Sequence, residues 1–232
     1  MCLLFVRLKS NVLCLVVVAM LLIGTCSCGN LREKSVDTKA MADEVKNREI
    51  KHITQAQLDE TANEWGNHVA QTAQKDLAEV LTAALAKYPL EEAAAFCRVK
   101  SLYKADSLSQ SYKALLNRSS LRELNKPTKL TETERQVLDA YLYNAENKLP
   151  QRPNVQRLED KYLLYTTPIV LDNPLCFRCH GEVGENLTSI DQRKLMTRYK
   201  LDSLVNRKEN SLLGMWRIAF EKKEMIKRID VK

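Results

Sequence analysis

A helical pattern between about residues 41 and 88 constrains the fold of this chain more than any other feature of the sequence. Its apolar side chains recur every three or four residues, the spacing of the buried stripe of an amphipathic helix. They are Leu58, Ala62, Trp65, Val69, Ala73, Leu77, Val80 and Ala84. Tyr88-Pro89 ends the pattern, because proline disfavours helical backbone at the residue before it. A pattern this long predicts a helix that extends beyond the core or pairs with a second copy of the chain.

Shorter elements follow this long pattern. Leu90, Ala94, Cys97 and Ser101 are predicted to share one face of a second helix. Strands are expected at 113–120, 162–170 (with a break near Pro168) and 213–220, and helices at 131–146 and 189–199. Because the chain is 45% apolar, it can bury a real core. Helices followed by separated strands predict an α+β fold with an antiparallel sheet.

Residues 1–28 are predicted to be an export signal. Arg7 and Lys9 precede twelve consecutive apolar residues, 12–23, a run shorter than the roughly 20 that a spanning helix needs. The following Gly-Thr-Cys-Ser-Cys-Gly resembles a bacterial lipoprotein cleavage box, in which the cysteine after the cut carries lipid. Cys28 is the predicted lipidation site and Cys26 the competing one; a plain signal peptide and an uncleaved anchor are the alternatives.

These predictions give a tether at 29–40 and a single domain at 41–232, on the periplasmic side of a membrane. Removing Arg7 and Lys9 lowers the net charge from +7 to +5. No basic stripe interleaved with aromatic residues is present, which argues against nucleic acid as a partner. A catalytic Ser/His/Asp set, paired catalytic carboxylates and a glycine-rich phosphate loop are also missing from the sequence, so an enzyme is not expected.

Cysteine usage points to a bound group. Four of the seven cysteines lie in the leader, and the rest of the chain keeps Cys97, Cys176 and Cys179. An odd number of cysteines in an exported protein argues against a disulfide framework. Residues 176–180 read Cys-Phe-Arg-Cys-His, which is C-x-x-C-H, the attachment signature of haem c. Cys176 and Cys179 are therefore predicted to bond covalently to one haem, with His180 on its iron.

Three other interpretations of the motif are open. Cys97, Cys176, Cys179 and His180 could form a Cys₃His zinc site. Cys176 and Cys179 could form a plain disulfide, or a thioredoxin-like redox pair, although no βαβ pattern surrounds them.

The second iron ligand is less constrained by the sequence. The candidates are His52, His68, Met41, Met196, Met215, Met225 and Cys97. Cys97 is distinguished by Ala93, Ala94 and Ala95 beside it, because small side chains let a flat porphyrin approach. A buried structural thiol is an equally good interpretation of Cys97 from spacing alone.

The combination of these features resembles an exported PAS-like haem-c domain family, long called a domain of unknown function. It occurs as stand-alone periplasmic haem proteins and as the sensory part of bacterial signalling proteins. The resemblance covers about residues 50–225. It is carried by the segments 93–97, 118–121 (Arg-Ser-Ser-Leu) and 176–181, and by Asn125, Pro168-Ile169, Tyr199, Asp202 and Gly214. Lys126 and Lys200 depart from the family pattern, which has proline there, and glycines are sparse before the last strand.

The resemblance implies a PAS-like antiparallel sheet flanked by helices. It also implies haem iron held between His180 and Cys97. The expected function is a haem-based redox or gas sensor module that acts with a partner protein, since no transmitter domain is recognisable. A periplasmic electron-transfer monohaem cytochrome and a non-haem binding lipoprotein are the alternatives.

Overall fold

The computed structural model describes residues 37–48, 53–121, 130–199 and 205–229. The predicted leader, its lipidation site Cys28 and the competing Cys26 lie outside the described residues, as does His52. The chain divides into two units, residues 1–49 and 50–232. In the first unit, the structure describes one helix, α2 (Thr38–Arg48), whose residues 38–45 are exposed.

The second unit contains a sheet and the helices around it. Its α-helices are α3 (Gln55–Lys87), α4 (Leu90–Ala93), α5 (Ala105–Tyr112), α6 (Glu132–Glu146), α7 (Pro174–His180), α8 (Ser189–Tyr199) and α9 (Lys222–Arg228), with 3-10 helices η1 (Ala94–Phe96) and η2 (Val99–Ser101). Its strands are β1 (Ala114–Ser120), β2 (Asn154–Leu158), β3 (Tyr162–Val170) and β4 (Leu212–Glu221). Among the described residues, no helix combines the length and the apolarity that crossing a membrane requires.

The four strands form one antiparallel sheet in the order β1-β4-β3-β2. This confirms the predicted α+β class, while the finer PAS-like assignment stays a prediction. The three predicted strands are present, and β2 is an edge strand that the sequence analysis missed. The expected break at Pro168 is wrong, because Pro168 pairs with Met215 inside β3 and the register shifts only after Ile169.

The pattern at 41–88 does not form one helix. Helix α3 begins at Gln55, because Thr54 is extended and closes a capping box: its side chain accepts from the Gln57 amide, and the Gln57 side chain accepts from the Thr54 amide. Beyond that start, the predicted stripe is correct. All of its members except the partly buried Trp65 are buried, and Tyr88 caps the helix C-terminus as expected.

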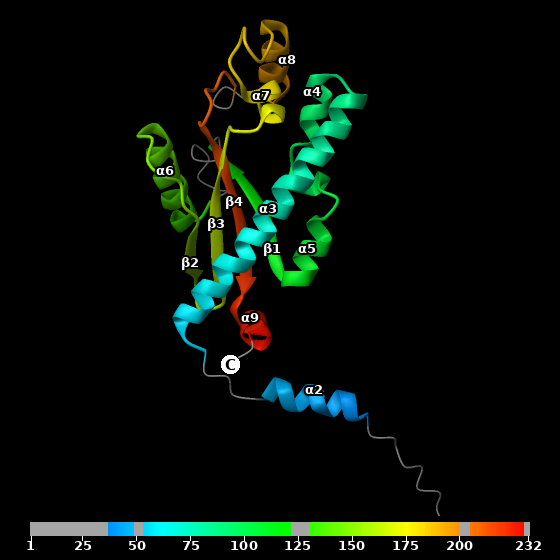
Figure 1. The fold of residues 1–232 in the computed structure, drawn as a ribbon, viewed down its shortest axis with the longest axis vertical. Helices are drawn as coiled ribbons and strands as arrows, with labels where there is room; N and C mark the ends of the chain where they lie inside the picture. Colours follow the sequence, from blue (N-terminus) through cyan, green and yellow to red (C-terminus); the bar gives the residue numbers. More distant parts are fainter. Residues whose placement is uncertain (1–36, 49–52, 122–129, 200–204, 230–232) are drawn as a thin grey trace, which may run out of the picture. The chain divides into compact units, whose positions relative to one another are not determined.

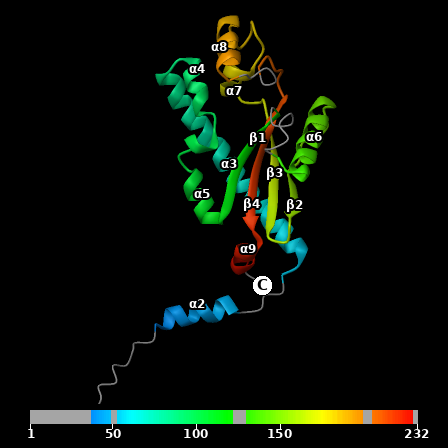
Figure 2. The same ribbon diagram turned by 180° about the vertical axis from the view of Figure 1, so that it is seen from behind.

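Helix α3 crosses one face of the sheet (Figures 1 and 2). Gly66 permits this close approach, since a Cβ atom there would lie 2.1 Å from Cγ of Tyr165 in β3. Side chains alternate along β4, so Trp216 joins the core beneath α3, whereas Met215 joins a second core beneath α6. Helix α6 therefore covers the opposite face.

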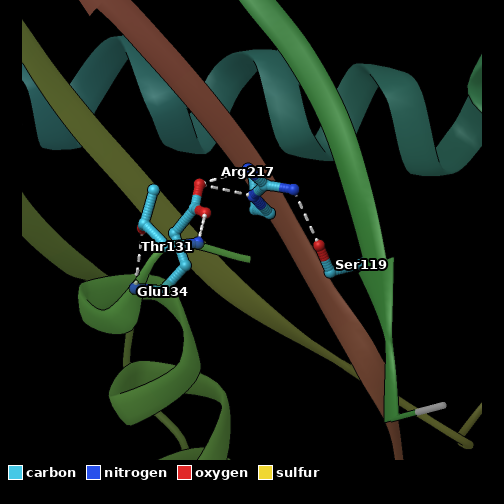
Figure 3. Close-up of polar contacts among 4 residues, drawn as sticks. All are labelled: Ser119, Thr131, Glu134 and Arg217. Atoms are coloured by element: carbon cyan, nitrogen blue, oxygen red, sulfur yellow. Dashed lines mark hydrogen bonds and ion pairs between the residues drawn. The ribbon is translucent and has the colours of Figure 1, made fainter. Parts of the chain in front are cut away.

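A buried ion pair fastens α6 to the sheet (Figure 3). Nε of Arg217 in β4 donates to Oε1 of Glu134 at 2.8 Å, and its Nη1 donates to Oγ of Ser119 in β1 at 2.9 Å. The second Glu134 oxygen accepts from the Thr131 amide at 2.8 Å, closing the capping box predicted for this helix. The pair fixes the edge strand β1 relative to β4, and β1 contributes to the cavity described below.

Candidate functional site

A cavity of about 410 Å³ lies between α3, β1 and α7, at the end of the sheet where α4, α7 and α8 gather (Figure 1). Its volume is within the roughly 300–1,000 Å³ typical of small-molecule sites. Aliphatic and small side chains form much of its wall: Leu77, Leu81, Leu85, Ala93, Ala94, Ala95, Leu175, Leu213 and Gly214. Such a wall suits an apolar ligand.

The motif cysteines enter this cavity from α7. Asn173 caps the helix by accepting from the Leu175 amide at 2.9 Å, and Pro174 occupies the first turn. In a helix, positions i, i+3 and i+4 share a face, so Cys176, Cys179 and His180 point the same way, and all three line the cavity. Helix α7 was not among the predicted elements, although Asn173-Pro174 is a typical helix N-terminus and indicates its start.

Cys97 reaches the same cavity from the segment after α4. The predicted second helix starts at Leu90 but is shorter than expected: α4 ends at Ala93 and η1 at Phe96, and the backbone leaves helical geometry at Cys97 (ψ 59°) and is extended at Arg98. The Cys97 thiol nevertheless lies on the cavity wall, which His180 also lines. The structure thus brings Cys97 into one cavity with Cys176, Cys179 and His180, which lie much later in the sequence.

Arg118 in β1 is a site residue to which the sequence analysis gave no role. Its Nη2 donates to the Cys97 carbonyl at 2.8 Å and to the Cys97 sulfur at 3.3 Å. The guanidinium carbon is 6.0 Å from the centroid of the Trp216 ring, a cation–π distance. The sequence alone does not show these contacts, because they depend on the strand register that places Arg118 opposite Trp216.

The three thiols differ in ionisation. Burial raises the pKa of Cys97, but the Arg118 charge and the interactions with His180 and Arg118 outweigh it and lower the pKa to about 6. Burial and the charge of Cys97, with a smaller effect of Asp172, raise the pKa of Cys176 to about 11. Burial and the charges of Cys97 and Cys176 raise the pKa of Cys179 to about 12. Of the three cavity thiols, Cys97 is therefore the one that loses its proton most readily.

The state of the thiols and the grouping of ligand-type side chains bear on the alternatives to haem. Cys97, Cys176 and Cys179 are free thiols in the structure. Over the described part of the chain, no group of three His, Cys, Asp or Glu side chains is placed to hold one metal ion.

The other candidate iron ligands described in the second unit do not line the cavity. His68 is exposed, and Met215 and Met225 are fully buried in the cores beneath α6 and α3. Met41 belongs to the first unit, where its side chain is exposed. Met196 packs in a third cluster, around Leu195 of α8. Of the predicted ligands with described side chains, Cys97 and His180 are the two on this wall.

Comparison with known proteins gives the family. The model of the Tll0287-like family matches residues 33–220. The chain belongs to the Tll0287-like family. Among solved structures, it is similar to the crystal structure of the cyanobacterial heme-protein Tll0287, at 17% identity and a TM-score of 0.41, over 68% of this chain and 95% of that one. No curated protein matches.

Proposed function

We propose that this chain binds one haem covalently as an exported c-type haem protein, with Cys176 and Cys179 as attachment sites and His180 and Cys97 as iron ligands. The observation that carries the proposal is that these four side chains line one cavity whose remaining wall is largely apolar. The namesake of the family, Tll0287, is described as a heme-protein, which supports the same assignment.

The attachment chemistry needs reduced thiols. Each S–H adds across one vinyl double bond, so that sulfur bonds to one carbon and hydrogen to the other, and no oxidant is consumed. The free thiols of Cys176 and Cys179 supply the two S–H groups. A bound haem supplies one-electron redox chemistry and, where an axial position opens, a site for gas ligands.

A redox or gas sensor is the role that we propose for the bound group. Cys97 interrupts its helical segment and is held by side-chain contacts rather than by regular secondary structure. An anionic thiolate prefers ferric iron, so a ligand held in this way is suited to leave the iron on reduction. Its departure would open the position to a gas and change the contacts around Arg118.

A haem-stained denaturing gel tests the attachment. The full chain, made in cells competent for haem attachment, should give a stained band, and the double variant Cys176→Ala/Cys179→Ala should not. Cys97→Ala should stay stained, because the thioethers use other cysteines, but its oxidised absorption spectrum should change. An unstained wild-type band would contradict the proposal, and an unchanged Cys97→Ala spectrum would remove Cys97 as a ligand.

A further inference from the structure

The Cys97 sulfur is not held in place by regular secondary structure. The residue follows η1, and its backbone has φ −73° and ψ 59°. Its amide donates to the Ala94 carbonyl at 3.2 Å, whereas the next residue is already extended. A ligand on such a turn needs contacts from elsewhere in the fold to keep one orientation.

Arg118 supplies such contacts to both parts of the residue. A single guanidinium nitrogen donates to the Cys97 carbonyl at 2.8 Å and to its sulfur at 3.3 Å. Hydrogen bonds that involve a charged group are about twice as strong as neutral ones, so the charged guanidinium makes both of these bonds stronger. The main chain and the side chain of Cys97 are thereby fixed together.

Arg118 is itself supported by two further elements. Its guanidinium carbon lies 6.0 Å from the centroid of Trp216 in β4. The Trp216 indole donates through Nε1 to Oε1 of Gln74 in α3 at 3.0 Å. A chain of contacts thus runs from α3 through β4 and β1 to the ligand.

The geometry points to Arg118 as a positioning residue, which keeps Cys97 on the distal side of the haem and so restricts exogenous ligands at that position. This inference rests on the proposed haem function. Arg118 acts through Cys97 and forms no bond to the iron.

Imidazole binding to the oxidised, haem-loaded full chain tests the inference. Loss of a hydrogen bond to a charged group should make Arg118→Met bind imidazole about ten- to a hundredfold more tightly, with a spectrum shifted toward that of Cys97→Ala. Arg98→Met is the matched control, because Arg98 lines the same cavity but donates through Nε to the Ala95 carbonyl. Its affinity for imidazole should stay within about threefold of wild type.

A second variant covers the case in which Arg118→Met does not fold, as judged by circular dichroism. Arg118→Lys keeps the charge but replaces the planar fork by a single point donor, so it should tighten imidazole binding less than Arg118→Met does. If both Arg118 variants fold and bind imidazole with the affinity of wild type, the inference is overturned. If only Arg118→Lys folds, an unchanged affinity in that variant overturns it.

A double-variant cycle separates positioning from a general structural role. In the Cys97→Ala background, Arg118→Met should leave imidazole affinity unchanged, because the group through which it acts is gone. The same fold-change in both backgrounds would overturn the inference. An unstained wild-type protein would instead contradict the haem function itself, so the two failures are distinguishable.

Discussion

The ionisation of Cys97 sets it apart from the other two cavity thiols. Thiolate is the reactive form, so Cys97, with a pKa of about 6, should be alkylated by iodoacetamide at pH 7 in the haem-free chain. Its labelling should reach half of its maximum rate near pH 6. Cys176 and Cys179 should be labelled only as the pH approaches about 11 and 12, respectively. Peptide mass spectrometry after timed labelling measures all three rates.

The same labelling separates the two opposing effects on Cys97. Burial raises the pKa and the Arg118 charge lowers it, so Arg118→Met should move the labelling midpoint of Cys97 to higher pH. Arg98→Met serves as the control and should leave that midpoint near its wild-type position. Equal labelling of all three cysteines at pH 7 would contradict the ionisation pattern.

Glu134 and Arg217 carry a prediction about stability. Glu134 is 3% exposed, so Arg217→Met leaves a buried carboxylate without its partner and should lower the free energy of unfolding by about 3–5 kcal/mol. Lys227→Met, which breaks a more exposed pair with Glu224, should change it by less than about 1 kcal/mol. Urea unfolding of the haem-free variants gives both values, and equal losses would contradict the structural role of the buried pair.

The sequence could predict some site residues but not others. Cys176, Cys179 and His180 are visible because covalent attachment requires a fixed local spacing. Cys97 could be proposed from its alanine neighbours, but only the fold shows that it lines the same cavity as His180. Gln74, Arg118 and Trp216 converge through strand register and helix packing, which leave no local signature.

Local signals also explain which elements the sequence could predict. Helix α6 is predictable because Thr131 and Glu134 form a capping box. Periodicity alone places the start of α3 too early, and the capping box of Thr54 and Gln57 marks its actual start. The second helix was predicted too long, because periodicity does not show the backbone turn at Cys97. Strand β2 was missed because its five residues are half-exposed on the sheet edge and lack a clear alternation.

The packing of α3 on β3 gives a prediction at the scale of elements. In an exposed helix interior, glycine to alanine stabilises by roughly 0.5–1 kcal/mol. Gly66→Ala should instead destabilise by about 1–3 kcal/mol, because its Cβ would overlap the Tyr165 ring and force α3 away from the sheet. Thermal unfolding is the measurement. Asn67→Ala, at the exposed neighbouring position, is the control and should stay within about 0.5 kcal/mol.

For the molecule as a whole, we predict that lipid on Cys28 attaches the protein to a membrane. The mature chain should then begin at Cys28, and its intact mass should include acyl groups. Cys28→Ser, which keeps Cys26, should lose the acyl mass and leave the membrane fraction. A native protein that begins at Cys26 with lipid would move the site, and one with no acyl mass would contradict membrane attachment through a lipid.

The proposed sensor role predicts a low reduction potential for the haem-loaded protein. An anionic Cys97 ligand stabilises ferric over ferrous iron, and the identity of the axial ligand is a principal control on potential. The reduction potential of Cys97→Ala should be more positive than that of wild type by at least about 60 mV. For a one-electron couple, this corresponds to a tenfold change in the preference for ferric over ferrous iron. A redox titration of both proteins measures the difference. A strongly positive wild-type potential would contradict thiolate ligation.

Carbon monoxide binding then separates a sensor from an electron carrier. In a sensor whose Cys97 leaves on reduction, the reduced wild-type protein should bind carbon monoxide about as readily as Cys97→Ala does. In an electron carrier, both axial ligands stay in place, and the reduced wild type should bind it far more weakly than the variant. Arg118 contacts Cys97 from a different strand, so it affects the iron only through that residue. Arg118→Met should therefore speed carbon monoxide binding only in a protein whose Cys97 stays on the iron after reduction. The contacts of Cys97 with Arg118 therefore bear on which of the two proposed roles, sensor or electron carrier, the protein has.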